Sequence, residues 1–155
     1  MRITLKNAIL IVHFQGDKEH MNALLNPISN QYEGVLEHRE GHNFPSVHIP
    51  KEHFLAKYKP MCEYVIGCYN TKSIAHELLH AKFYMDISYR EQILLEWQDL
   101  ESAHRNIITI FLKKLGYSDK VLIDEYQAYR YTEAPNFFGI RLSNTVSESN
   151  RAIRH

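Results

Sequence analysis

The chain has 155 residues, which is the usual size of one domain and enough to bury a hydrophobic core. Its 18 basic and 18 acidic side chains give a formal net charge of zero, which argues against nucleic acid or an anionic membrane as the main partner. With 45% hydrophobic residues the composition is that of an ordinary globular protein, apart from an unusual ten histidines. We therefore expect a single domain over residues 1–155.

The first sixty residues predict part of a small sheet. Residues 2–14 contain an apolar run typical of a first strand, and residues 17–31 indicate a short helix or loop broken by Pro27. Two short strands are expected at 34–41 and 45–50, followed by a helical turn over 51–58. The N-terminal apolar run is too short to span a bilayer and lacks a cleavage site with small residues. We therefore expect an intracellular, cytoplasmic protein without a signal peptide or transmembrane segment.

The stretch EYVIGCYN, residues 63–70, predicts a buried strand that leads into a helix ending near residue 86. Asn70 or Thr71 is the expected N-cap of this helix. The two cysteines, Cys62 and Cys68, are six positions apart, which on a strand separates them by roughly 20 Å. That distance is too long for a disulfide, so both are expected to be reduced.

The second half of the sequence is helical. Apolar positions recur at helical spacing from residue 89 to residue 115, and Gly116 marks the end of that helix. Ser118 is expected to cap another helix over 119–132, which stops before Pro135. The polar tail, residues 143–155, is expected to be flexible. The predicted fold class is α+β, with a small N-terminal mixed sheet followed by a helical C-terminal half.

The helix after the 63–70 strand carries the sequence HELLH, residues 76–80. Residues at positions i and i+4 share one helix face, so His76 and His80 can bind one ion. Glu77 lies beside them, where it can take a proton from a water that the metal activates. Chance occurrence of so short a motif is the alternative. The apolar residues around it argue against chance, because burying the polar triplet without a partner would be costly.

A catalytic zinc site needs a third protein ligand, and three carboxylates are candidates. Asp86 follows His80 by six residues, but that arrangement requires a glycine where the chain has Phe83. Glu101 borders the apolar stripe of the 89–115 helix. Glu125 lies at the centre of an otherwise apolar face of the 119–132 helix, where a carboxylate must be paired or bound to metal. Glu125 is therefore preferred, and small Ala128, one turn on, lets that helix approach a neighbour closely.

The span 62–132, with its strand, HELLH helix and DEYQAY stretch, resembles the HExxH zinc metallopeptidases (zincins), and among them the gluzincins and minigluzincins. The resemblance implies one Zn²⁺ per chain, held by His76, His80 and Glu125, and peptide-bond hydrolysis with Glu77 as general base. It also implies a polypeptide substrate, paired by strand addition to the strand just before the helix. The candidate oxyanion donors are Tyr129, Tyr131, Arg130 and His104.

Other residues have two interpretations. Asp124 can orient a ligand histidine, although a solvated charge on a helix face is the commoner role. The histidines at 38, 42, 48 and 53 can form a second metal site, but exposed loop histidines are the simpler interpretation because no carboxylate or cysteine spacing around them supports such a site. Cys68 precedes His76 by eight residues, so a role as a thiolate ligand of the same metal is one interpretation. The other is a buried thiol within the strand.

Two non-catalytic alternatives remain at the sequence level. One is a structural or protein-binding component that keeps the zincin fold without turnover, against which the intact Glu77 argues. The other is a metal-free interaction module with a fortuitous motif. Metal content separates the second from the rest, and substitution of Glu77 separates the first from an enzyme. The oligomeric state is not predicted.

Overall fold

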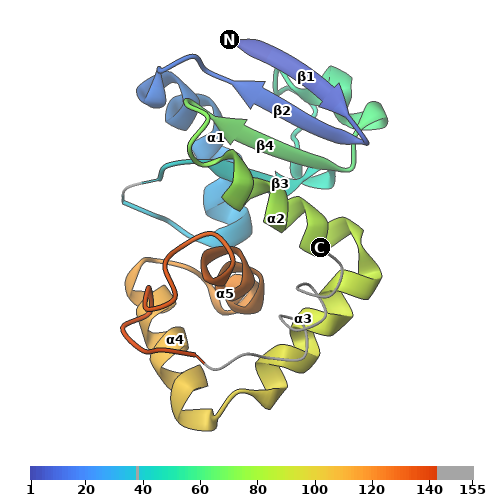
Figure 1. Ribbon diagram of the computed structural model, residues 1–155. Coiled ribbons are helices and arrows are strands. Elements are labelled where there is room, and N and C mark those ends of the chain that lie inside the picture. Colours follow the sequence, from blue (N-terminus) through green and yellow to red (C-terminus); the bar gives the residue numbers. More distant parts are fainter. Residues whose placement is uncertain (38, 143–155) are drawn as a thin grey trace.

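The computed structural model describes residues 1–37 and 39–142 and shows an α+β fold. A four-stranded mixed sheet lies between helices α1 and α2, and helices α3, α4 and α5 form a second layer beyond α2 (Figure 1). The predicted α+β class is confirmed. The tail that we expected to be flexible lies outside the described residues.

The sheet has the strand order β1-β2-β4-β3. Strands β1 (Arg2–Lys6) and β2 (Ile9–His13) form an antiparallel hairpin, so the single strand expected over 2–14 is wrong. The chain reverses at Asn7 and Ala8, which have φ of 52° and 63°. Two consecutive positive φ values suit the twist of a two-residue hairpin. Of the two residues, only Asn7 is of a type that signals such a turn in a sequence, and Ala8 is not.

Strand β4 (Tyr64–Cys68) confirms the strand predicted at 63–70. It is one of the two interior strands, parallel to β2 on one side and antiparallel to β3 on the other. This arrangement leaves β4 without a free edge, so the expectation that an extended substrate pairs with it is wrong. Cys62 and Cys68 are buried free thiols, as predicted.

Strand β3 (His42–Pro45) lies between the two positions where strands were expected. The described residues of 34–41 form no strand, because Arg39 is drawn back to the end of α1 by an ion pair with Glu33. Residues 46–48 form a short 3₁₀ helix instead of a strand, and another 3₁₀ helix spans Ala56–Met61. The residues between the two expected strands, together with Pro45, form β3 itself, stabilised by pairing with β4 more than by their own propensity.

Helix α1 (Lys18–Glu33) passes through Pro27, so the predicted break there is wrong. Asp17 caps its first turn by accepting from the His20 amide, and Gly34 follows its last turn with a φ of 106°. Met21, Leu25 and Ile28 on this helix pack into one core with Leu10, Val12 and Val65 of the sheet. Burial of this face outweighs the hydrogen bond that a proline removes.

Helix α2 (Ile74–Met85) covers the opposite face of the sheet, where Ala81 packs against Tyr64 and Ile66. The residue at its N-cap is Ser73 and not Asn70 or Thr71. Its buried residues are Glu77, His80 and Ala81, whereas Leu78 is 39% exposed. The polar part of HELLH therefore faces the interior, and part of the apolar part faces solvent.

The helix expected over 89–115 is two helices, α3 (Ile87–Asp99) and α4 (Ser102–Lys114). Between them Leu100 has an extended backbone (ψ 146°) and buries its side chain against α4 and α5. The Arg105 guanidinium donates to the carbonyls of Gln98 and Leu100, which satisfies the end of α3. Helical periodicity runs through this break because the apolar stripes of the two helices are in phase.

Helix α5 (Leu122–Arg130) follows a 3₁₀ turn at Asp119–Val121 and packs against α2, α3 and α4 (Figure 1). Ala128 is fully buried, as its proposed role in close helix packing requires. This packing brings the middle of α5 against the buried face of α2. No helix in the described part of the chain is long and apolar enough to cross a membrane.

Candidate metal centre and its cavity

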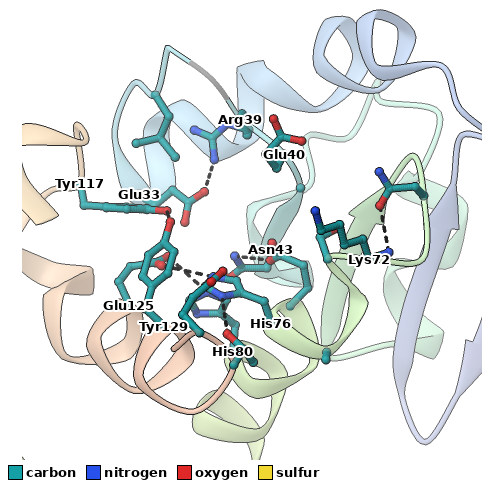
Figure 2. A pocket seen from close by; sticks show the side chains of 18 of the residues that line it. Glu33, Arg39, Glu40, Asn43, Lys72, His76, His80, Tyr117, Glu125 and Tyr129 are labelled. Carbon is teal, nitrogen blue, oxygen red and sulfur yellow. Dashed lines mark hydrogen bonds and ion pairs between the residues drawn. The ribbon is translucent and has the colours of Figure 1, made fainter. Parts of the chain in front are cut away.

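Three side chains from two helices converge at the contact between α2 and α5 (Figure 2). His76, His80 and Glu125 each offer a ligand atom, and these atoms lie within 4.8 Å of one another. The Glu125 carboxylate is 3.3 Å from His80 Nε2 through one oxygen and 3.7 Å from His76 Nε2 through the other. The structure thus brings together the three residues predicted as ligands.

The donors of this cluster are of the kinds that zinc prefers, namely two imidazole nitrogens and a carboxylate. Glu125 is 2% exposed, and its Oε2 atom has no hydrogen-bond partner. A buried carboxylate oxygen in that state is unfavourable unless a cation compensates it. The residues therefore fit a divalent metal, with His76, His80 and Glu125 as its ligands.

Asp124 supports the cluster from behind. Its carboxylate accepts a hydrogen bond of 2.8 Å from His80 Nδ1, which turns Nε2 toward Glu125 and His76. Gln127 donates to the same carboxylate oxygen and to the Leu79 carbonyl, which joins α5 to α2. Asp124 is buried, so its interpretation as a solvated helix-face charge is wrong. The contact is that of a partner that orients a ligand histidine.

The charges of this buried group shift one another's pKa values. Burial alone lowers the pKa of His80, but the Asp124 and Glu125 carboxylates outweigh it and raise that pKa well above its ordinary value. Burial alone raises the pKa of Glu125, but the two imidazoles lower it to about 2. Glu125 is therefore ionised at neutral pH, as a ligand must be.

Glu77 lies beside the cluster and is 5% exposed. Its Oε2 atom accepts a hydrogen bond of 2.9 Å from Asn43 Nδ2 on β3. Burial raises its pKa, which strengthens it as a base relative to a solvated carboxylate. Glu77 belongs to no ligand group, so it is placed to accept a proton near the cluster without binding the ion.

A cavity of about 730 Å³ opens over the cluster. It reaches from the ligands past the residues that lead into β3, and charged side chains such as Glu40 and Lys72 line its outer part. Tyr129 covers one side, with its ring centroid 4.5 Å from that of His76, and its hydroxyl lies 2.8 Å from that of Tyr117 (Figure 2). Burial raises both phenol pKa values, so both hydroxyls stay protonated at neutral pH.

The other predicted ligands lie elsewhere. Glu101 is at the start of α4 with a side chain that is 79% exposed, and its Oε2 atom lies 4.0 Å from His104 Nε2. Asp86 caps α3 by accepting from the Tyr89 amide. Neither belongs to the cluster formed by the described residues, so the structure brings Glu125, and neither Glu101 nor Asp86, to the two histidines.

Of the four candidate oxyanion donors, Tyr129 alone lines the cavity. Tyr131 and Arg130 bond to buried Glu96 on α3. His104 pairs with Glu101 on the surface. Tyr131 and Arg130 therefore join the end of α5 to α3, whereas the His104 contact stays within α4, and none of the three lines the cavity.

The second histidine group does not form a metal site among the described residues. His42 is buried and bonds to Ser29 and Asn22, and His53 lies beside the Leu24 carbonyl. His48 is exposed and packs on the Tyr32 ring, and His38 lies outside the described residues. Cys68 is not part of the cluster of His76, His80 and Glu125. It is a buried thiol of strand β4, which is the simpler of its two interpretations.

Three residues of the site were missed at the sequence level: Asn43, Tyr117 and Thr132. Asn43 reaches Glu77 from β3, and Thr132 Oγ1 lies 3.3 Å from His76 Nδ1. Thr132 lies just after α5 and continues the helical spacing of Glu125 and Ala128, so the sequence pattern already placed it on the same face as Glu125. Asn43 and Tyr117 reach the site only through the tertiary fold.

Comparison with known proteins adds no relative: no family model, curated protein or solved structure matches this chain.

Proposed function

We propose that the protein is a zinc-dependent peptidase of gluzincin type. The observation that carries this proposal is the meeting of Glu125 with His76 and His80, beside the buried carboxylate of Glu77, at the floor of a cavity. A structural zinc site is closed by four protein ligands, whereas a catalytic site has three and an open position. The described residues offer three ligands, and the cavity reaches them.

The roles of the residues follow from their positions. His76, His80 and Glu125 hold the metal, and Asp124 orients His80. Zn²⁺, when bound, supplies a Lewis acid that polarises a carbonyl and makes water a better nucleophile at neutral pH. Glu77 accepts the proton of the attacking water and returns it to the leaving amine. Tyr129, alone or with Tyr117, donates to the oxygen on which negative charge develops.

The substrate is proposed to be a polypeptide in extended conformation. Strand β3 is an edge of the sheet, and both Asn43 and the preceding Gly41 line the cavity. An edge strand offers unpaired backbone groups to an added strand. We therefore place the substrate along β3, in place of the interior strand β4.

The test is hydrolysis of unstructured protein and of internally quenched peptide libraries by the zinc-loaded enzyme. Glu77→Gln should bind zinc as the wild type does and lose at least about 100-fold in kcat, because proton transfer by a placed side chain contributes about 10²–10⁴-fold. Glu133→Gln, at the rim of the same cavity, is the matched control and should retain turnover. Equal turnover by Glu77→Gln and wild type would refute the role of Glu77. Zinc binding without cleavage of any peptide would favour a binding protein.

A further inference from the structure

Strand β3 and the residue just before it, Gly41, approach the two carboxylate oxygens of Glu77. Asn43 Nδ2 donates to Glu77 Oε2 at 2.9 Å, with Asn43 3% exposed. Gly41, two residues earlier, faces the other oxygen: a Cβ at Gly41 would lie 2.7 Å from Glu77 Oε1. The carboxylate is thus confined from two directions by one short segment of chain (Figure 2 shows Asn43 beside the cluster).

The direction of the Asn43 amide is itself determined. Tyr64, on the neighbouring strand β4, donates its hydroxyl to Asn43 Oδ1 at 2.6 Å. Because the amide oxygen accepts from this phenol, the amide NH₂ must face Glu77. The opposite orientation would set an amide oxygen against a carboxylate oxygen. Tyr64 is fully buried between the sheet and α2, so the phenol has little freedom to turn away.

We propose that Asn43 is a positioning residue, which holds the Glu77 carboxylate in the orientation for proton transfer and is itself oriented by Tyr64. This inference rests on the proposed peptidase function. The contacts run from β4 through β3 to α2, so they join the base to the rigid interior of the sheet. The strand that we propose for substrate pairing is then also the strand that holds the base.

A residue that only supports the fold and a residue that positions the base differ in two measurable ways. Loss of positioning lowers kcat at unchanged KM, because the interaction matters only when the proton moves. It also changes the surroundings of the bound ion. The visible spectrum of the Co²⁺-loaded protein reports those surroundings without turnover, and Glu77→Gln provides the reference spectrum for a site without the carboxylate.

The variant is Asn43→Ala, measured for Co²⁺ and Zn²⁺ stoichiometry, for the Co²⁺ spectrum and for kcat and KM on the same quenched peptides. We expect full metal content, a spectrum displaced toward that of Glu77→Gln, and a kcat reduced about 10–100-fold at similar KM, as for other residues that orient a reacting group. Tyr64→Phe removes only the hydroxyl that orients Asn43. It should change the Co²⁺ spectrum and kcat in the same direction as Asn43→Ala, but by a smaller amount. It also provides the test if Asn43→Ala does not fold.

Ser29→Ala is the matched control. It removes another buried hydrogen bond to the same strand, the 2.7 Å contact between Ser29 Oγ and His42 Nδ1, without touching Glu77. It should keep both the wild-type spectrum and the wild-type kcat. Asn43 and Tyr64 variants that match wild type in both readouts, or that differ no more than Ser29→Ala, would overturn the positioning role. If the wild type binds cobalt and cleaves no peptide, the peptidase function fails and the spectra alone decide the role of Asn43.

Discussion

Glu125 is the residue on which the metal site depends. Its two carboxylate oxygens face the two HELLH imidazoles, and one of them has no hydrogen-bond partner. The sequence predicted the helix that carries Glu125. It also predicted that a carboxylate on the apolar face of this helix needs a cation or a metal as a partner. The pairing with His76 and His80 required the packing of α5 on α2, which no local pattern encodes.

Removal of the Glu125 charge should weaken metal binding. In Glu125→Gln we expect zinc affinity to fall at least about 100-fold, more than the loss of an orienting partner typically causes. Competition with a chromophoric chelator measures this affinity. Glu101→Gln is the control and should bind zinc normally, because Glu101 is exposed and distant from the ligand group. The reverse result would make Glu101 the ligand.

The opposed pKa shifts of His80 and Glu125 predict how the metal-free protein responds to pH. The raised pKa of His80 stabilises the fold fully below about 6.5, and this contribution is lost as pH rises through the folded pKa. The lowered pKa of Glu125 stabilises the fold at pH values above the ordinary pKa of a glutamate, and this contribution is lost as the pH falls toward about 2. Both contributions of this pair are present together in mildly acidic solution.

Zinc should reverse the alkaline part of this dependence, because it binds neutral imidazole and competes with the proton on His80. We therefore expect the gain in urea midpoint on adding zinc to be larger at about pH 8 than at about pH 5.5. Urea unfolding with and without zinc at the two pH values measures it. A zinc effect of equal size at both pH values would contradict the assigned ligands.

At the scale of elements, the end of α1 and the end of α4 meet closely, next to residues that line the cavity, namely Glu33 and Tyr117. Gly34 and Gly116 both have φ of 106°, and a Cβ on Gly116 would lie 2.3 Å from the Val35 carbonyl oxygen. The Ser118 amide also donates to the Glu33 carbonyl at 3.0 Å. This contact ties the sheet-bearing half of the chain to the helical layer.

Gly116→Ala should therefore destabilise the fold by about 2–4 kcal/mol, from a strained φ together with a backbone clash. Gly139→Ala is the matched control, because Gly139 also has a positive φ (81°) but nothing lies within 4 Å of its Cβ position. It should cost about 1 kcal/mol, from the φ alone. Urea unfolding measures both. Equal losses would show that the close contact is absent in solution.

How well the sequence predicted each element depended on whether its signal was local. Strand β4, helix α2 and helix α5 were predicted because local apolar patterns mark them. The caps expected for the two helices are wrong: α2 begins after Ser73, and α5 begins after Val121, with Ser118 before the 3₁₀ turn instead. Helix α1 was wrongly broken at Pro27, where packing against the sheet outweighs propensity, and the α3–α4 break was hidden by in-phase periodicity. Strand β3 was misplaced because its residues have turn propensity and depend on β4 for pairing.

At the scale of the whole molecule, the two larger hydrophobic cores of the described residues are joined through α2 and α5, and a small cluster of Tyr64, Ile66 and Ala81 lies between the sheet and α2. One core lies between the sheet and α1, and the other among α4, α5 and the segments that follow them. The candidate metal centre lies at the junction, with ligands from both α2 and α5. A bound metal would therefore stabilise the contact between the two helices in addition to its chemical role.

Metal content is the most direct test of this account. Protein purified without chelator or added metal should contain about one zinc per chain by inductively coupled plasma mass spectrometry, as a site with two His and one Glu ligand predicts. Glu125→Gln prepared in parallel should contain much less. Wild-type protein without zinc, which also takes up none on titration, would contradict the metal site and the peptidase function with it.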